Sequence, residues 1–299
     1  MSTPSGSGAQ HRILDGAPAT VPLLLKAAVP LVPGLNRLPG LRRDSRVLPD
    51  LTLTRPGVRV DQGHVAAYSE VCGFPLTETL PLTYPHLLAF GLHLSIMTDA
   101  SFPFPAIGTV HLENSVTQHR PIRATERLEV TARATNLRPH PKGRVFDMVT
   151  SVKSGEELVW EETSTFLRRG GGDGTAPDTG SDSLEHAPPS GVEWRLPSSL
   201  GRTYAAVSGD HNPIHLYALT AKAFGFPRQI AHGMWSKARC VAALEGRLPD
   251  AVTVDVVFRR PVLLPGTVAF GSLRGTTGYA FSLTSPTSGA PHLLGQARE

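Results

Sequence analysis

The chain has 299 residues, of which 40% are hydrophobic, so it is long enough to build two ordinary globular cores. Its formal net charge of +4 comes from 29 basic and 25 acidic residues spread along the sequence, which argues against a surface built for nucleic acid. Cys72 and Cys240 lie far apart, with no metal-ligand spacing around either, so a disulfide framework is not expected.

Residues 1–49 are interpreted as an N-terminal extension. Residues 1–16 are rich in Ser, Gly and Thr, and we expect them to be mobile. The most apolar early stretch, residues 21–32, is interrupted by Lys26 and Pro30 and is too short to cross a bilayer. The start of the chain also lacks the features of a secretory signal, so the sequence predicts no membrane span and a cytoplasmic location.

Two halves with the same order of elements follow the extension, over residues 50–168 and 193–299. In each half an apolar helical run, residues 84–97 or 230–244, precedes an alternating strand-like segment, residues 108–116 or 250–258. Both halves continue through a Pro-containing turn into strand-like runs that end near Phe166 and Leu294. The repeat predicts a duplication in which each half packs one helix against an antiparallel sheet.

Residues 169–192 separate the two halves. Most of this segment reads RGGGDGTAPDTGSDSLEHAPPS and contains almost no large apolar side chain. Such a composition cannot anchor a buried element, so the segment is predicted to be a flexible linker.

Polar and titratable groups are concentrated in the predicted turn SGDHNPIH, residues 208–215. Asp210 and Asn212 belong to residue types that hydrogen-bond their own backbone, and Pro213 fixes the bend before His215. A carboxylate and an imidazole on one rigid loop can converge on a single water molecule, as acid/base catalysis requires. Either residue alone is more often structural. Combined with the helix entered through His232, they indicate a catalytic pair, Asp210 and His215.

Gly233 is the candidate for binding a developing negative charge. At a helix start its N–H points outward with the positive end of the helix dipole behind it, which suits a thioester oxygen. A glycine needed only for close helix packing is the alternative. His211 and His215 have a spacing that could hold zinc on a helix, but Pro213 lies between them and no third ligand is apparent. We therefore expect no metal and no cofactor.

Four further polar residues are weaker candidates. His86 lies in the half without the loop and is expected to be a core or surface histidine. Tyr204 is expected to pack under the loop, and His111 and Asn114 could line a pocket from a strand.

The second half resembles the MaoC-like dehydratases and (R)-specific enoyl-CoA hydratases, also called hydratase 2, of the hotdog fold. The matching residues are Asp210, Asn212, Pro213, His215, Gly225, Phe226, His232, Gly233 and Met234. The resemblance implies that Asp210 and His215 act together on the catalytic water and that the Gly233 N–H receives the thioester oxygen. Substrate binding or loop support is assigned to Asn212, Pro213, His232 and Met234.

Beyond its N-terminal segment the chain is similar to the long double-hotdog 3-hydroxyacyl-thioester dehydratases of actinobacterial type. The implied fold is α+β, with two antiparallel sheets side by side in one chain, each wrapping a central helix. A degenerate, non-catalytic first hotdog (residues 50–168) would precede a catalytic MaoC-like second one (residues 193–299). The first half has YSEVCGF, residues 68–74, in place of the loop, which would leave room for a longer acyl chain. Val241 stands where some single-domain relatives carry a serine.

The implied reaction is the reversible hydration and dehydration between trans-2-enoyl and (R)-3-hydroxyacyl thioesters in fatty-acid or related lipid metabolism. The expected partner is an acyl-CoA or acyl-carrier-protein substrate, and the expected assembly is an internal pseudo-dimer that could also form a homodimer. Two alternatives stay open: a hotdog acyl thioesterase, with its carboxylate on or near the central helix, and a non-enzymatic acyl-thioester-binding module. The sequence does not decide the acyl length, the carrier or the division of roles between Asp210 and His215.

Overall fold

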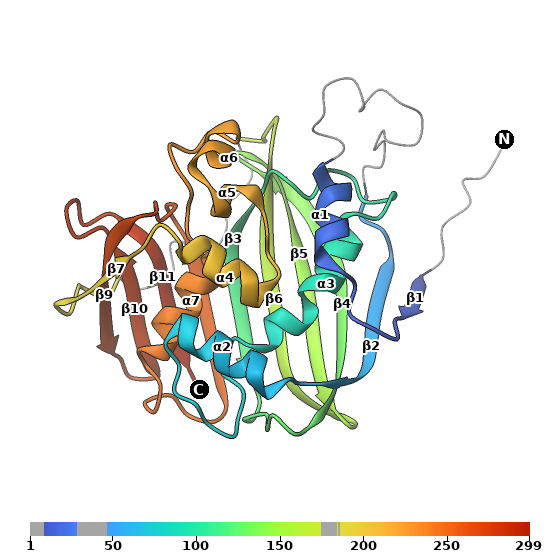
Figure 1. Cartoon of the computed structure of the whole chain (residues 1–299), viewed down its shortest axis with the longest axis horizontal. Coiled ribbons are helices and arrows are strands. Elements are labelled where there is room, and N and C mark those ends of the chain that lie inside the picture. Colours follow the sequence, from blue (N-terminus) through green and yellow to red (C-terminus); the bar gives the residue numbers. More distant parts are fainter. Residues whose placement is uncertain (1–8, 29–46, 175–183, 185) are drawn as a thin grey trace.

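The structure is a computed structural model, and it describes residues 9–28, 47–174, 184 and 186–299. Figure 1 shows the described elements in chain order. The N-terminal extension contains β1 (Gln10–Ile13) and α1 (Thr20–Ala28). The first half contains β2 (Leu51–Arg59), α2 (Gln62–Cys72), α3 (Pro85–Met97), β3 (Thr109–Gln118), β4 (Arg127–His140), β5 (Gly143–Ser154) and β6 (Glu157–Arg169). The second contains β7 (Val192–Leu196), α4 (Leu200–Ser208), α5 (Pro213–Leu216), α6 (Ala218–Ala223), α7 (Gly233–Ala242), β8 (Val252–Phe258), β9 (Gly266–Arg274), β10 (Gly278–Thr284) and β11 (Pro291–Arg298).

The two halves share one 11-stranded sheet, in the order β1-β2-β4-β5-β6-β3-β8-β11-β10-β9-β7 (Figure 1). The pairs are antiparallel except for β1 and β2, which are parallel. The halves meet where β3 pairs with β8, with Asn114 opposite Val256 and Thr117 opposite Thr253. Backbone hydrogen bonds across this pair join the two expected sheets into a single surface.

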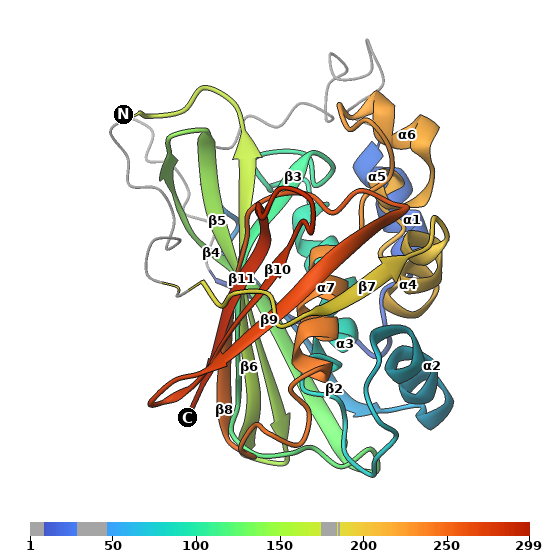
Figure 2. The ribbon, with the colours of Figure 1, turned by 90° about the vertical axis from the view of Figure 1, so that its left-hand side faces the viewer.

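The helices lie together on one side of the sheet (Figure 2). In the first half α3 packs against β2, β4 and β5, and in the second α7 packs against β10. Buried residues such as Leu92 and Ile96 in α3, and Ala238 and Val241 in α7, face these contacts. Each half therefore folds its strands around one buried helix, which is the double hotdog that the resemblance implies.

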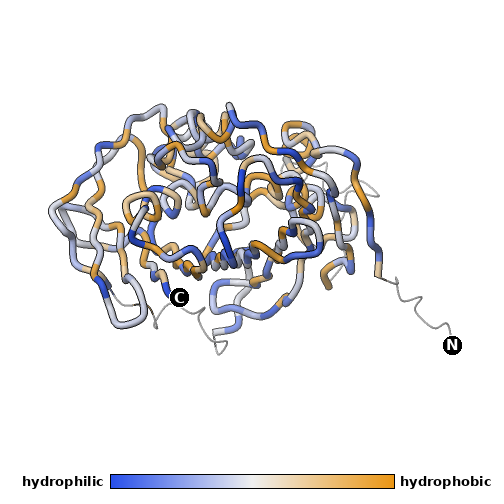
Figure 3. The backbone as a smooth tube through the Cα atoms, turned by 90° about the horizontal axis from the view of Figure 1, so that it is seen from below, coloured by the Kyte–Doolittle hydropathy of each residue, from blue (hydrophilic) through white to orange (hydrophobic). Residues whose placement is uncertain are grey.

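Alternation along the strands explains how the sheet covers these helices. In β8 the side chains of Val252, Val254 and Val256 are buried, whereas Thr253 and Asp255 between them are partly exposed. Figure 3 colours the backbone by hydropathy and shows hydrophobic and hydrophilic stretches interspersed through the molecule. A sheet that buries one face against helices requires this period of two.

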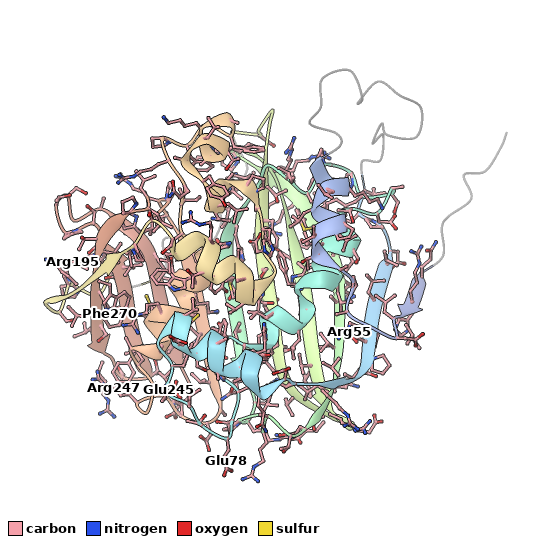
Figure 4. The ribbon with its side chains drawn as sticks, viewed as in Figure 1. Arg55, Glu78, Arg195, Glu245, Arg247 and Phe270 are labelled. Carbon is pink, nitrogen blue, oxygen red and sulfur yellow. The ribbon has the colours of Figure 1, made fainter. Side chains whose placement is uncertain are left out.

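Side chains also connect the helices to both outer parts of the sheet (Figure 4). Phe270 on β9 stacks on Trp194 of β7 with ring centroids 5.1 Å apart, and the Arg239 guanidinium of α7 lies 4.5 Å from the centre of the Trp194 ring. Toward the opposite edge, Arg55 on β2 donates a hydrogen bond of 3.1 Å to the Leu88 carbonyl of α3. Both contacts hold the central helices against the sheet.

The N-terminal extension differs from the expectation in one respect. Residues 10–13 form β1, which pairs with β2, so the expected mobility is wrong for these residues. The reason is that the open edge of β2 offers unpaired backbone groups, which β1 satisfies. Residues 1–8 of the extension and residues 175–183 and 185 of the predicted linker lie outside the described residues. The domain boundaries remain a prediction. No helix among the described residues is long and apolar enough to cross a membrane.

Candidate active site

The loop between α4 and α5 is held by hydrogen bonds within itself. The Asp210 N–H donates to Ser208 Oγ at 3.2 Å, and Asp210 Oδ1 accepts from the Asn212 N–H at 3.1 Å. Asn212 Oδ1 in turn accepts from the Ile214 N–H at 3.4 Å, and Pro213 begins α5. With Oδ1 occupied in this way, Oδ2 is the Asp210 oxygen left for chemistry.

His215 is buried in α5 with a defined hydrogen-bonding direction. Its Nδ1 lies 2.8 Å from the Ile230 carbonyl oxygen, which can only accept a hydrogen bond. Nδ1 therefore carries the proton, and Nε2 is the basic nitrogen of the uncharged ring. Burial lowers the pKa of His215, although the Asp210 carboxylate acts in the opposite direction. The ring is thus suited to accept a proton at neutral pH.

His232 contacts both members of this pair. Its Nε2 lies 3.0 Å from the Asp210 carbonyl oxygen and 3.8 Å from Asp210 Oδ2. Its ring stacks on the His215 ring with centroids 3.7 Å apart. The centroid of the Tyr204 ring lies 4.8 Å from that of His232. Burial, with His215 nearby, lowers the pKa of His232 to about 3, so the ring is uncharged. His232 therefore contacts both the Asp210 backbone and the His215 ring, which supports the prediction that it holds the loop.

Gly233 is the first residue of α7, immediately after His232. A helix does not satisfy the N–H of its first residue, and the positive end of its dipole lies at that N–H. A Cβ at Gly233 would lie 3.1 Å from Cε1 of Phe258, so a larger residue would press on this ring. The contact with Phe258 supports the packing explanation of the glycine, and the accessible N–H stays a prediction.

These groups open onto one cavity of about 350 Å³. Its wall includes six of the seven predicted site residues: Asp210, Asn212, His215, His232, Gly233 and Met234. Pro213 is not part of the wall and acts only at the start of α5. The opposite wall comes from α3, β3 and β6 of the first half, so the cavity lies between the two halves.

Comparison with known proteins identifies the family. A MaoC like domain is recognised over residues 187–275, which run from the end of the predicted linker through most of the second half. The 3-hydroxyacyl-thioester dehydratase X of Mycobacterium tuberculosis (strain ATCC 25618 / H37Rv) is 39% identical over 285 residues, which cover 94% of this chain and 98% of that protein. This chain belongs to the MaoC-like dehydratase family.

Solved structures of MaoC-like dehydratases agree with this assignment. The crystal structure of HtdX of Mycobacterium tuberculosis superposes with a TM-score of 0.74 at 40% identity, over 83% of this chain and 99% of that one. A MaoC-like dehydratase from Phytophthora capsici gives a TM-score of 0.65 at 19% identity, over 83% of this chain and 93% of that one, which shows the shared fold. The double-hotdog prediction is confirmed.

Asp210, His215 and His232 also offer ligand atoms that all lie within 4.8 Å of one another, a set that could in principle hold a cation. The orientation of the rings does not favour it. An ion lies near the plane of each imidazole that binds it, whereas the two rings are stacked with only 25° between their planes. His232 Nε2 is also already bonded to the Asp210 carbonyl. The arrangement of Asp210, His215 and His232 therefore suits acid/base chemistry better than metal binding.

Some of the weaker candidates line the cavity and others do not. His86 is buried and lines the cavity, as does His111, whereas Asn114 is buried behind the wall. The sequence reasoning missed Glu162 on β6, which is buried and bonded to His86. Its alternation with the buried Trp160 and Ser164 is the signal that could have placed it inside.

Proposed function

We propose that this protein catalyses the reversible hydration of trans-2-enoyl thioesters to (R)-3-hydroxyacyl thioesters. The observation that carries the proposal is the arrangement of Asp210 Oδ2, the free Nε2 of His215 and the Gly233 N–H on one cavity wall. The first two groups can hold and deprotonate one water. The third can bind the carbonyl oxygen of a thioester.

In the hydration direction, the water held by Asp210 and His215 delivers its hydroxyl to the β carbon of the enoyl group. The electron pair of the carbon–carbon double bond moves toward the thioester carbonyl, whose oxygen gains negative charge at the Gly233 N–H. The proton taken from the water returns to the α carbon from the same side. Dehydration reverses these steps, and neither direction requires a cofactor to balance it.

The Mycobacterium tuberculosis relative supports this reaction class, since it is called a 3-hydroxyacyl-thioester dehydratase. Basic residues of the cavity wall, including Lys142, Arg169 and Arg260, offer contacts for the phosphate groups of CoA or of acyl carrier protein. The substrate would then be held at two points, with its thioester carbonyl at the Gly233 N–H and the phosphate groups of its carrier at these basic residues. The acyl chain then extends toward α3.

Crotonyl-CoA mixed with the purified protein tests the proposal. Loss of the enoyl absorbance without release of free thiol is the expected result. Release of thiol would instead indicate an acyl thioesterase, and binding without any reaction would indicate an acyl-thioester-binding module. Chiral analysis of the 3-hydroxybutyryl product tests the (R) assignment separately.

A further inference from the structure

The first half of the chain places a second polar group of residues beside the cavity. His86, at the second position of α3, lies with Nδ1 at 2.8 and 2.9 Å from the two carboxylate oxygens of Glu162. Asn114 Nδ2 donates to the same carboxylate at 2.5 Å. Behind them, Lys237 of α7 donates to Asn114 Oδ1 and to the Val254 carbonyl. These contacts form a buried network that crosses the junction between the halves.

The network fixes the direction of the His86 ring. Burial raises the pKa of Glu162, but His86, His93 and Asn114 together bring it down to about 2, so the carboxylate is ionised. An ionised carboxylate only accepts hydrogen bonds, which places a proton on His86 Nδ1. His86 lines the cavity, and its Nε2 has no partner among the described residues. This nitrogen is therefore available to hydrogen-bond with a ligand in the cavity.

His111 adds a second unused nitrogen to the same wall. Its Nε2 is buried and has no hydrogen-bond partner in the part of the chain that the structure describes. The ring is held between Phe166, at a centroid distance of 4.5 Å, and Phe258, at 5.0 Å. Burial, followed by the influence of His86, lowers the pKa of His111 to about 3. A buried nitrogen of this kind lowers stability unless a ligand or a water satisfies it.

His111 lies one aromatic ring away from the proposed position of the reacting thioester, and His86 lines the same cavity. Phe258 contacts His111 on one side, and on the other it is the ring that a Cβ at Gly233 would meet at 3.1 Å. The rest of the α3 wall is largely apolar, with Phe90, Leu94 and Met97. An acyl chain extending from Gly233 past Phe258 would therefore meet an apolar surface interrupted by two hydrogen-bonding nitrogens.

We propose that His86 and His111 form a subsite for a hydroxyl group on the acyl chain, so that the protein selects thioesters oxygenated beyond the β carbon. The inference rests on the proposed function for the placement of the thioester. A hydroxyl group both donates and accepts hydrogen bonds, so it can bond to His86 Nε2 and His111 Nε2 together, which satisfies both nitrogens. A plain hydrocarbon chain leaves both unpaired, and sites built to bind a hydroxyl discriminate against ligands that lack it.

Two measurements with matched ligands test the subsite. Isothermal titration calorimetry compares octanoyl-CoA with its 6-, 7- and 8-hydroxy derivatives, and kinetics compare trans-2-octenoyl-CoA with the corresponding hydroxy compounds. At least one hydroxy ligand is expected to bind roughly tenfold more tightly than the plain ligand, a difference that one satisfied buried hydrogen bond can supply. The same position of the hydroxyl should give the higher kcat/KM.

Two variants assign the preference to the histidines. His111→Phe keeps an aromatic ring between Phe166 and Phe258 and removes Nε2, which has no hydrogen-bond partner among the described residues, so the variant should fold. His86→Gln keeps a donor for Glu162 while changing the group that faces the cavity. Both should reduce the ratio of the two dissociation constants toward one. Phe90→Leu, on the same wall, should alter the affinities of both ligands alike and keep the ratio.

The proposal is overturned if octanoyl-CoA binds as tightly as every hydroxy derivative, or if the preference survives in both histidine variants. Crotonyl-CoA separates this failure from failure of the proposed function, because its four-carbon chain is too short to carry the distal hydroxyl. Hydration of crotonyl-CoA without a hydroxyl preference removes the subsite alone. If no enoyl-CoA is hydrated the proposed function fails, and calorimetry with the saturated ligands still decides whether the subsite exists.

Discussion

The rings of His215 and His232 stack with their centroids 3.7 Å apart, and each ring is held by a different backbone carbonyl. The Ile230 carbonyl accepts from His215 Nδ1, and the Asp210 carbonyl lies 3.0 Å from His232 Nε2. His232 therefore fixes both proposed catalytic groups at once. Because it is uncharged, it does so without adding a positive charge beside His215.

His232→Phe separates the ring stack on His215 from the hydrogen bond to the Asp210 carbonyl. Phenylalanine can keep the stack on His215 but cannot donate to the Asp210 carbonyl. Loss of one buried hydrogen bond that positions a catalytic group should lower kcat by about tenfold while changing KM little. Steady-state kinetics with crotonyl-CoA measure this split. His232→Gln, which can still donate, should recover part of kcat; equal losses in both variants would show that the carbonyl contact is unimportant.

Gly201 in α4 provides a second way to move His215. A Cβ at this position would lie 1.9 Å from the His215 carbonyl oxygen, so α4 and α5 pack directly against each other here. Gly201→Ala should push the two helices apart, lowering stability by about 1–3 kcal/mol and displacing the His215 ring. Thermal unfolding and crotonyl-CoA hydration should both decline.

Thr203→Ala is the matched control, because Thr203 is exposed on the same helix. It should affect neither measurement strongly. A Gly201→Ala protein with wild-type stability and wild-type activity would contradict the contact between α4 and His215.

Buried histidines should make the protein sensitive to acid. Burial lowers the pKa values of both His93 and His232 from 6.5 to about 3. Between these values the unfolded chain binds protons that the folded chain does not. The free energy of unfolding should therefore be retained above pH 6.5 and fall as the pH is lowered through this window. Each such group contributes a loss of about 1.4 kcal/mol per pH unit.

Denaturant unfolding followed at a series of pH values from about 7 to 4 checks this dependence. His93→Gln removes one titrating group and should make the decline shallower. A free energy of unfolding that stays constant across the series would mean that these histidines are charged or accessible in the folded protein.

Local patterns explain how much of the fold could be predicted from the sequence. The repeat of elements could be predicted, because the spacing of hydrophobic residues shows which face of a helix or strand is buried. This spacing is seen in the helical runs at residues 84–97 and 230–244 and in the alternating valines of β8. The junction of the sheets could not be predicted in the same way. It depends on contacts between distant strand edges, such as Ser115 Oγ donating to Asp255 Oδ1 at 2.6 Å and the Thr117 and Thr253 hydroxyls 3.0 Å apart.

In the candidate site too, residues placed by local sequence could be predicted, whereas contacts between distant residues could not. Asp210 and His215 are predicted as a pair from turn chemistry within a few residues, and the structure places both on the wall of one cavity. The bond between His86 and Glu162 joins residues that are 76 positions apart, so neither pattern nor spacing reveals it. The sequence therefore predicts an ordinary core or surface histidine at position 86, whereas the structure places His86 on the cavity wall.

Hydration of crotonyl-CoA by Asp210→Asn, His215→Ala and the double variant tests the central claim most directly. Each single substitution should lower kcat/KM by roughly 100- to 10,000-fold, and the double variant should be little worse, since both groups act on one water. His211→Ala is the control, because His211 lies in the same loop but is not part of the cavity wall. It should retain most of the activity. Near wild-type hydration by a folded His215→Ala protein would contradict the account and place the chemistry elsewhere in the chain.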